Sequence, residues 1–488
     1  MPITRRKALG AALGAAAVSC SKPKGPPNIL FVMTDDHAQG HLGCYGNKLT
    51  STPNMDRIAV EGARFDNAFV TNSLCAPSRA TVLTGAYSHL HGIRGNSEAK
   101  DNIEKIDPTM PTFPQLLQKA GYRTGLVGKW HLSHDPVGFD YWNILPGQGL
   151  YFNPEFIEKG QHKKLSGYAT DLTTDMALDF LDKDHERPFC LVYQHKAPHR
   201  PFSPPERYSE DLAKVEIPHP PTYDDNYATR KIAKEAEDMR FDTSLAGDYK
   251  NMPKDLKPGE RKEWLFQRFV KDYYGAIRAI DENLGRVFDA LVQQGKYEDT
   301  LIIYTSDNGF FVGDHGWYDK RFMYEPSLKV PLMIRAPGAA RGLAPRQMAV
   351  NIDLAPTILD YAGVAAPATM QGKSLRPILE GKASPDWRTS MYYAYYENSW
   401  VLAGKGLAAR SDPSFQYFTP HRIGPHRGVR TMTHKLIHYY AEGNYWELFS
   451  LSEDPNELNN VYGKLGTEAI TAELKSEMER LRRQYRDT

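Results

Sequence analysis

The sequence of 488 residues predicts an α/β protein whose large, mixed but mostly parallel sheet is sandwiched by helices. Apolar runs without alternation, at 28–34 and 300–306, fit strands that are buried on both faces, as in parallel sheets. Between such runs lie segments with the apolar spacing of helices. After residue 385 the pattern changes to half-buried strands and one amphipathic helix, which predicts a smaller C-terminal antiparallel sheet plus helix.

The main elements follow in order along the chain. Helices are expected at 75–84, 111–120, 273–291, 350–364 and 470–485, and strands at 122–128, 188–193, 329–338, 391–396, 428–440 and 445–451. Residues 202–262 are rich in proline and charge and have no clear periodicity, so they are expected to wrap the site as an insertion. We expect a main domain over 28–385 and a C-terminal subdomain over 386–488.

Composition limits the partners. The formal net charge is +1, which gives no broad attraction to nucleic acid or to an anionic membrane surface. The length is sufficient for one large core or two domains. Four cysteines in a chain of this length do not form a disulfide framework. The sequence leaves open whether Cys44 and Cys190 pair.

The N-terminus has the features of an export signal. Arg5 and Arg6 precede an Ala/Leu/Gly run that ends near Val18, too short to span a bilayer, which needs about 20 residues. The arginine pair suggests the twin-arginine route. Ala17-Val18-Ser19-Cys20 resembles a bacterial lipoprotein cleavage box, which favours a lipid-anchored chain that begins at Cys20, in the periplasm or at the cell surface. Plain secretion is the alternative. Residues 1–27 are therefore expected to be signal and tether.

Hard oxygen ligands follow two of the predicted buried strands. Asp35 and Asp36 end the first, and Asp307 and Asn308 follow the strand at 300–306. In open α/β sheets, ligands bind at the carboxyl ends of strands. Carboxylate and amide oxygens suit Ca²⁺ or Mg²⁺, provided that the two strand ends are neighbours. The alternative is a pair of solvated turns.

Basic side chains follow two further strands. Lys129 and His131 are two residues apart, so in an extended chain both point to the same side. His195 and His199 follow the strand at 188–193 and are candidates for proton transfer. A solvated lysine and turn or strand-end histidines are the alternative.

Cys75 stands where a turn of small residues enters a helix. Pro77 suits a first helical turn, and Arg79 points back from that turn. The free peptide N–H groups of a helix start attract an anion. The alternative is a buried cysteine without a function, which is common.

The run Cys-x-Pro-Ser-Arg at 75–79, followed by Ala-Thr-x-Leu-Thr-Gly at 80–85, resembles the signature of the type I sulfatases of the alkaline phosphatase superfamily. Gly-Lys-Trp-His at 128–131 is similar to the second signature of that family. The resemblance extends from about Asn28 to the end. It implies an alkaline phosphatase-like fold and oxidation of Cys75 to formylglycine by a formylglycine-generating or sulfatase-maturating enzyme. It also implies one Ca²⁺ ion, held by Asp35, Asp36, Asp307, Asn308 and residue 75.

The resemblance also implies roles for the basic residues. Arg79, Lys129 and Lys320 would supply positive charge to the sulfate. His131 would stabilise and deprotonate the formylglycine hydrate. His199 or Lys320 would protonate the leaving alcohol. His195, His315 and His426 are weaker candidates for substrate contacts.

The expected function is therefore hydrolysis of sulfate monoesters on a carbohydrate. Residues 319–331 look most like those of N-acetylglucosamine-6-sulfatases, which would make the protein an exo-acting glycan sulfatase. Galactan, fucan or ulvan sulfatase, phosphoester or phosphonate hydrolase, and an inactive glycan-binding protein are the alternatives.

Overall fold

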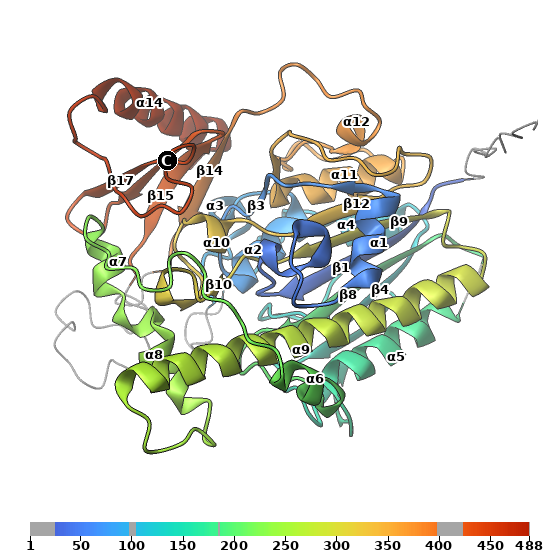
Figure 1. Cartoon of the computed structure of the whole chain (residues 1–488). Helices are drawn as coiled ribbons and strands as arrows, with labels where there is room; N and C mark the ends of the chain where they lie inside the picture. The colour runs from blue at the N-terminus through green and yellow to red at the C-terminus, as the bar shows by residue number, and fades with distance from the viewer. Residues whose placement is uncertain (1–24, 97–103, 184–185, 398–422, 488) are drawn as a thin grey trace, which may run out of the picture.

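A computed structural model describes residues 25–96, 104–183, 186–397 and 423–487 (Figure 1). The predicted export signal with Cys20 lies outside these ranges, apart from the last residues of the tether. None of the helices in these ranges is both long and apolar enough to cross a bilayer.

The core of the fold is a nine-stranded sheet. Its order is β2 (Ala63–Arg64), β12 (Leu332–Arg335), β9 (Thr300–Ser306), β1 (Asn28–Asp35), β8 (Phe189–Pro198), β4 (Arg123–Lys129), β5 (Tyr141–Leu145), β6 (Glu155–Glu158) and β7 (Gln161–Lys164). The five strands from β9 to β5 are parallel, and the pairs outside them are antiparallel. The predicted mixed, mostly parallel sheet is confirmed.

Helices cover both faces of this sheet. α1 (Pro53–Glu61), α5 (Ala169–Leu181) and the long α9 (Pro258–Gln293) pack on one face, and α9 and α5 run side by side in Figure 1. α2 (Cys75–Thr84), α4 (Phe113–Lys119) and α11 (Leu354–Tyr361) pack on the other. β1 serves both layers because its side chains alternate: Leu30 faces the first layer and Phe31 the second. Both are fully buried, as a continuous apolar strand requires.

The C-terminal unit is a four-stranded antiparallel sheet with one helix on it. The strands are β14 (Ser390–Tyr395), β15 (His426–Thr431), β16 (His434–Tyr439) and β17 (Tyr445–Ser450), and α14 (Glu468–Tyr485) packs on the first three. Figure 1 shows this unit in red beside the large sheet. The Tyr393 hydroxyl donates to the carbonyl of Arg321 at 2.8 Å, which joins the unit to the main body.

Further short strands and α-helices connect these elements. They are β3 (Ala68–Phe69), α3 (Ser88–His91), α6 (Ser209–Ala213), α7 (Lys231–Glu235), α8 (Phe241–Ser244), β10 (Phe311–Val312), β11 (Tyr318–Asp319), α10 (Glu325–Leu328), β13 (Ala349–Val350) and α12 (Arg376–Leu379). Cys44, Cys75 and Cys190 are free thiols, so Cys44 and Cys190 do not pair.

Several expected boundaries were wrong. The strand expected at 329–338 is limited to β12, and the helix expected at 350–364 begins only at Leu354. β8 continues to Pro198, so Gln194, His195 and Lys196 belong to the strand and not to a loop. α9 begins at Pro258, well before the first apolar residue of the expected stripe. The expected strand at 428–440 is a hairpin that turns at 432–433, where the sequence has no glycine or proline; the backbone N–H of His434 donates instead to the Thr431 hydroxyl at 3.0 Å.

Candidate active site

The ends of β1 and β9 meet at one edge of the sheet. Thr34 pairs with Ser306 in the parallel ladder, so Asp35 and Asp307, the next residues along, become neighbours. The backbone N–H of Asp307 donates to the Thr34 carbonyl at 3.1 Å, and that of Asp36 donates to the Asp307 carboxylate at 3.1 Å. The register of two strands thus assembles the acidic residues.

This acidic cluster suits a hard cation. Asp35, Asp36 and Asp307 are buried, and each offers a carboxylate oxygen within 4.8 Å of the others. The amide nitrogen of Asn308 donates to Asp36 at 2.6 Å, while its amide oxygen is buried without a hydrogen-bond partner in the described part of the chain. Burial, and then the neighbouring carboxylates Asp35 and Asp307, raise the pKa of Asp36 to about 7 despite the opposing effect of Lys320. An oxygen-ligated Ca²⁺ or Mg²⁺ ion would satisfy this donor set.

Cys75 is the first residue of α2 and lies against this cluster. Its Sγ is 3.5 Å from Asp35 Oδ1 and 3.1 Å from Lys320 Nζ. Every residue of α2 is buried. Burial, and next the charge of Asp35, raise the pKa of the thiol far above its usual range. The unmodified side chain is therefore a neutral thiol and a poor nucleophile at neutral pH.

Three cationic side chains surround the thiol, and each contacts an acidic residue. The Arg79 guanidinium donates to Asp307 at 3.0 Å and to the Lys129 carbonyl at 2.8 Å. The ammonium group of Lys129 contacts Asp35, and that of Lys320 contacts Asp36. Arg79, Lys129 and Lys320 come from three separate parts of the chain and are almost fully buried. The centre thus combines a helix start, three cations and three carboxylates.

Two histidines border the same centre. His199 Nε2 is 3.7 Å from Asp36 Oδ2, and its Nδ1 is 2.7 Å from the Arg200 carbonyl. Because a carbonyl only accepts, Nδ1 carries the proton and Nε2 of the neutral ring is the acceptor. Burial, and then the charge of Lys129, hold the pKa of His199 well below its usual range. His131 follows β4 in a left-handed conformation (φ 53°), and its Nε2 is 3.2 Å from the Gln148 amide nitrogen.

The three weaker histidine candidates do not join this centre. His195 lies on the opposite face of β8, fully buried and edge-to-face with Tyr193 at 4.3 Å. His315 is buried, and its Nδ1 is 2.6 Å from the Asp225 carboxylate. His426 is buried beside Tyr395 and Tyr439, with its Nδ1 3.0 Å from the Gly424 carbonyl.

Further polar residues belong to the centre, and of these Gln194 and Asn96 were not predicted from the sequence as site residues. Gln194 accepts from Arg79 at 2.9 Å, and Gln148 accepts from Lys129 at 2.6 Å. The Asn96 amide oxygen accepts from the Ala76 N–H at 2.9 Å, next to Cys75. Asp319 and Arg321 flank Lys320, form an ion pair at 2.9 Å and both have positive φ. The expected strand at 188–193 was too short to include Gln194 and His195. A longer strand would have placed Gln194, and not His195, on the face of the centre, because side chains alternate along a strand.

Gly128 permits the close approach of β4 and β8 at this edge. Its φ is +98°, and a Cβ atom would lie 1.7 Å from the carbonyl oxygen of Gln194. Only glycine fits there, which explains the residue before Lys129 in the Gly-Lys-Trp-His run.

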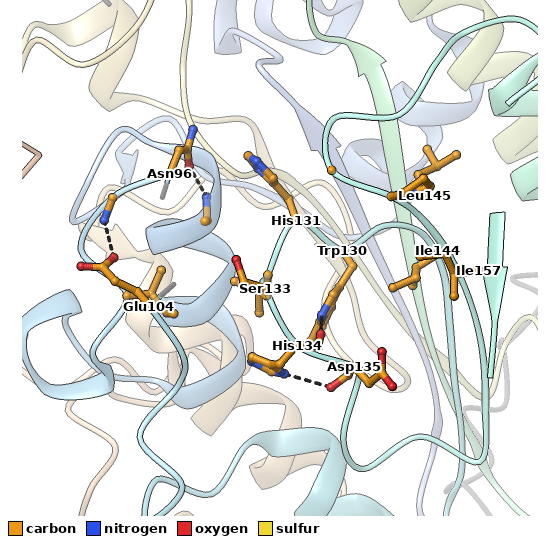
Figure 2. Close-up of a pocket in the computed structure, with 16 residues that line it drawn as sticks. Asn96, Glu104, Trp130, His131, Ser133, His134, Asp135, Ile144, Leu145 and Ile157 are labelled. Carbon is orange, nitrogen blue, oxygen red and sulfur yellow. Dashed lines mark hydrogen bonds between the residues drawn. The ribbon is translucent and has the colours of Figure 1, made fainter. Parts of the chain in front are cut away.

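A cavity of about 380 Å³ opens beside His131 (Figure 2). Figure 2 shows Asn96 and Glu104 on one side and Leu145, Ile144 and Ile157 on the other, with the 130–135 segment between them. The cavity borders the residue after Cys75, since Ala76 also lines it.

Comparisons with known proteins agree with this geometry. The family model described as "Sulfatase" matches residues 27–364, and that described as "N-sulphoglucosamine sulphohydrolase, C-terminal" matches residues 313–484. An N-acetylglucosamine-6-O-sulfatase of Bacteroides thetaiotaomicron is 40% identical, over 96% of this chain and 89% of the relative.

Solved structures show the same fold. One, described as a complex with its substrate D-glucosamine-2-N,6-O-disulfate, has a TM-score of 0.85 and 39% identity over 95% of this chain and 99% of that chain. A phosphonate monoester hydrolase from Silicibacter pomeroyi has a TM-score of 0.75 and 24% identity over 94% of this chain and 96% of its own, which shows a common fold only.

Proposed function

The chain belongs to the sulfatase family, the sulfuric ester hydrolases, and from this premise we propose that it removes the 6-O-sulfate from glucosamine residues of a sulfated glycan. The observation that carries the proposal is the convergence of Arg79, Lys129 and Lys320 on Cys75 at the first turn of α2. A sulfate monoester presents an anionic group to be transferred, and buried cations at a helix start suit that charge.

The substrate part of the proposal draws on two relatives. One is named for removal of sulfate from N-acetylglucosamine, and the other was solved with a 6-sulfated glucosamine. Both are similar to this chain over nearly its whole length. The phosphonate hydrolase has the same fold, so the fold alone does not separate sulfate from phosphonate esters.

The cationic, amide and acidic residues of the centre have separate roles in the proposed reaction. We assign Lys129, Arg79 and Lys320 to the sulfate oxygens, where each removed donor would cost about 10²- to 10³-fold in rate. Gln194 holds the Arg79 guanidinium, and Gln148 holds the Lys129 ammonium. A Ca²⁺ ion held by Asp35, Asp36, Asp307 and Asn308 would add positive charge beside the ester.

Residue 75 would act as formylglycine, whose hydrated aldehyde supplies the nucleophilic hydroxyl that a thiol lacks. A formylglycine-generating or sulfatase-maturating enzyme is therefore a required partner. We assign His131 as the group that accepts the proton of that hydroxyl.

The leaving alcohol needs a proton. Two groups qualify, Lys320 by its ammonium and His199 by Nε2 once protonated. Burial disfavours the charged form of His199, so in the free protein Lys320 is the one of the two groups that carries a proton to donate, although, against the effect of burial, Asp36 raises its pKa and makes it a weak acid. Release of the alcohol and of sulfate consumes one water per turnover.

The test is sulfate release from glucosamine 6-sulfate, with N-acetyl and N-sulfo groups compared, in the presence of Ca²⁺. Peptide mass first establishes the aldehyde at position 75. Release that is lost on Cys75→Ala, and absent with galactose 6-sulfate and with glucosamine 6-phosphate, would support the proposal. Fully converted protein that prefers the phosphate ester would overturn it in favour of a phosphoester hydrolase. Release of galactose or fucose sulfate would instead move the substrate to another polysaccharide.

We further propose export and anchoring through a lipid on Cys20. The twin arginines, the short apolar run and the cysteine at its end support this proposal. Labelling of growing cells with a fatty acid, and its loss on Cys20→Ala, is the corresponding test.

A further inference from the structure

A second cavity, of about 250 Å³, lies between the main body and the C-terminal unit. Its lining consists of three arginines, three tyrosines, an alanine and an aspartate: Arg94, Arg427, Arg482, Tyr392, Tyr396, Tyr440, Ala394 and Asp487. The β14 residues Tyr392 and Ala394 alternate with Tyr393, which points toward Arg321 and the active site. The cavity therefore opens on the face of β14 that is turned away from the catalytic centre.

The arginines of this cavity are only partly paired. Arg482 binds Glu479 at 2.9 Å. Arg94 and Arg427 have no carboxylate within 4.0 Å among the residues that the structure describes. In the same set, the Nε atoms of Arg427 and Arg482 are buried without a hydrogen-bond partner. Buried donors of this kind are costly unless a ligand or water takes their hydrogen bonds.

Aromatic rings fix the guanidinium groups. Arg427 lies over the Tyr440 ring at 4.7 Å, and Arg94 lies over the Tyr396 ring at 5.7 Å. A guanidinium held by its face keeps its N–H edge for an oxyanion, because the donors lie in the plane. The one carboxylate in the lining, Asp487, already accepts from the Tyr392 and Tyr396 hydroxyls. The lining is thus positively charged and rich in hydrogen-bond donors.

We propose that this arginine–tyrosine cavity binds an anionic group, a sulfate or carboxylate, of a sugar of the same glycan whose end is cleaved at Cys75. The inference rests on the proposed function. Arginine side chains bind sulfate and carboxylate groups through charge-assisted hydrogen bonds, and the faces of tyrosine rings can pack against a sugar ring. The volume is below that of a pocket for a whole drug-sized ligand, so it fits one anionic substituent and part of its ring.

Consecutive residues of one segment, 94–96, border the two sites. Asn96, two residues after Arg94, accepts the Ala76 N–H at 2.9 Å beside Cys75. Its own backbone N–H donates to Glu397, the residue after Tyr396, at 3.1 Å. Arg94 lines the arginine–tyrosine cavity, and the next two residues, Gly95 and Asn96, line the cavity beside His131, which favours a substrate that contacts both.

The experiment compares ligand length. Binding is measured by calorimetry in the Cys75→Ala background, with glucosamine 6-sulfate and with a heparin-type tetrasaccharide that ends in 6-sulfated glucosamine. The variants are Arg94→Gln, which replaces an exposed side chain, Arg427→Gln, and both together. Arg483→Gln removes the same charge from an exposed position of α14 outside the cavity and is the matched control.

The expected result is a rise of about tenfold or more in the tetrasaccharide Kd for the double variant, with the monosaccharide Kd within about twofold of the parent. A tetrasaccharide that keeps its carboxylates and the terminal 6-sulfate but has no other sulfate identifies the anion: a retained effect indicates the carboxylate and a lost effect the sulfate. Unchanged tetrasaccharide affinity in the double variant, or an equal loss in Arg483→Gln, would overturn the inference.

The two proposals fail separately. In one outcome the converted enzyme releases sulfate from glucosamine 6-sulfate while its tetrasaccharide affinity does not change on substitution of Arg94 and Arg427. That result would contradict only the proposal of the second site. Enzyme that releases no sulfate, yet loses tetrasaccharide affinity in the double variant, would remove only the proposed reaction.

Discussion

Lys320 Nζ lies 3.1 Å from the sulfur of Cys75 while the same ammonium group contacts the Asp36 carboxylate. Burial opposes its positive charge, but Asp36, and then the other negative groups, raise the pKa of Lys320 well above its usual value. The group is therefore a lasting cation next to the position of the nucleophile.

We expect Lys320→Ala to lower kcat/KM for glucosamine 6-sulfate by about 10²- to 10³-fold, because it removes a cation from the transferring group. Steady-state sulfate release measures this. Lys382→Ala, at an exposed surface lysine, should leave the rate unchanged. A rate within twofold of the parent for Lys320→Ala would rule out the role assigned to Lys320.

Gln194→Leu should lower both activity and stability. The substitution leaves the buried Arg79 guanidinium with one hydrogen bond fewer, which costs about 1–3 kcal/mol in the free energy of unfolding. We expect roughly a tenfold loss of kcat/KM, since Arg79 loses its fixed orientation. Gln194→Glu keeps an acceptor but adds negative charge, so its stability should be closer to the parent while KM for the anionic substrate rises. If both variants have the KM of the parent, Gln194 does not act through Arg79.

Removal of divalent cations should destabilise the protein. Asp35, Asp36 and Asp307 each contact a cationic side chain. The Asn308 amide oxygen, however, is buried without a hydrogen-bond partner in the described part of the chain, and a bound ion would satisfy it. A bound ion at 100 times its Kd adds about 2.7 kcal/mol to the free energy of unfolding. The melting temperature should fall in EGTA and recover with Ca²⁺ in excess. Identical melting curves and rates with and without chelator would contradict a Ca²⁺ site at this cluster.

Stability should also depend on pH through Glu447 in the C-terminal sheet. Burial raises the pKa of this carboxyl to about 7 from its usual 4.5, despite the lowering effects of the Tyr324 hydroxyl and Arg230. The contribution of protonated Glu447 to the free energy of unfolding is fully present below pH 4.5, where this side chain is protonated in the unfolded chain as well. It is lost as the pH rises through 7.

Glu447→Gln should therefore stabilise the protein at pH 8, by on the order of 2–3 kcal/mol, and flatten the decline between pH 4.5 and 7. Urea denaturation at several pH values is the measurement. Glu453→Gln, an exposed neighbour, is the control and should retain the slope of the parent. A steeper decline in Glu447→Gln would show that the carboxylate is stabilised by its surroundings.

The strands that carry the acidic residues could be predicted because the signal is local. An apolar run followed by Asp35 and Asp36, or by Asp307 and Asn308, is complete within ten residues. Their adjacency could not be predicted this way, since it depends on β9 pairing with β1 across more than 250 residues of chain. Only the family resemblance anticipated that contact.

The polar residues around Arg79 illustrate the opposite case. Histidine drew attention to His195, because its side chain is chemically versatile, whereas Gln194 is the one that faces Arg79. The difference comes from the length of β8, which continues past the last apolar residue into polar sequence. Periodicity cannot register such an extension, because tertiary contacts with β1 and β4 determine it.

The complete burial of α2 sets an order of events in the life of each molecule. Cys75 has no exposed surface, and the charges that surround it are themselves buried. A modifying enzyme could not reach the thiol in the folded chain, so the oxidation proposed for this residue would have to occur before α2 packs. A molecule that folds before this oxidation would remain inactive for as long as it stays folded. The active fraction of a preparation would therefore reflect a race between maturation and folding during synthesis.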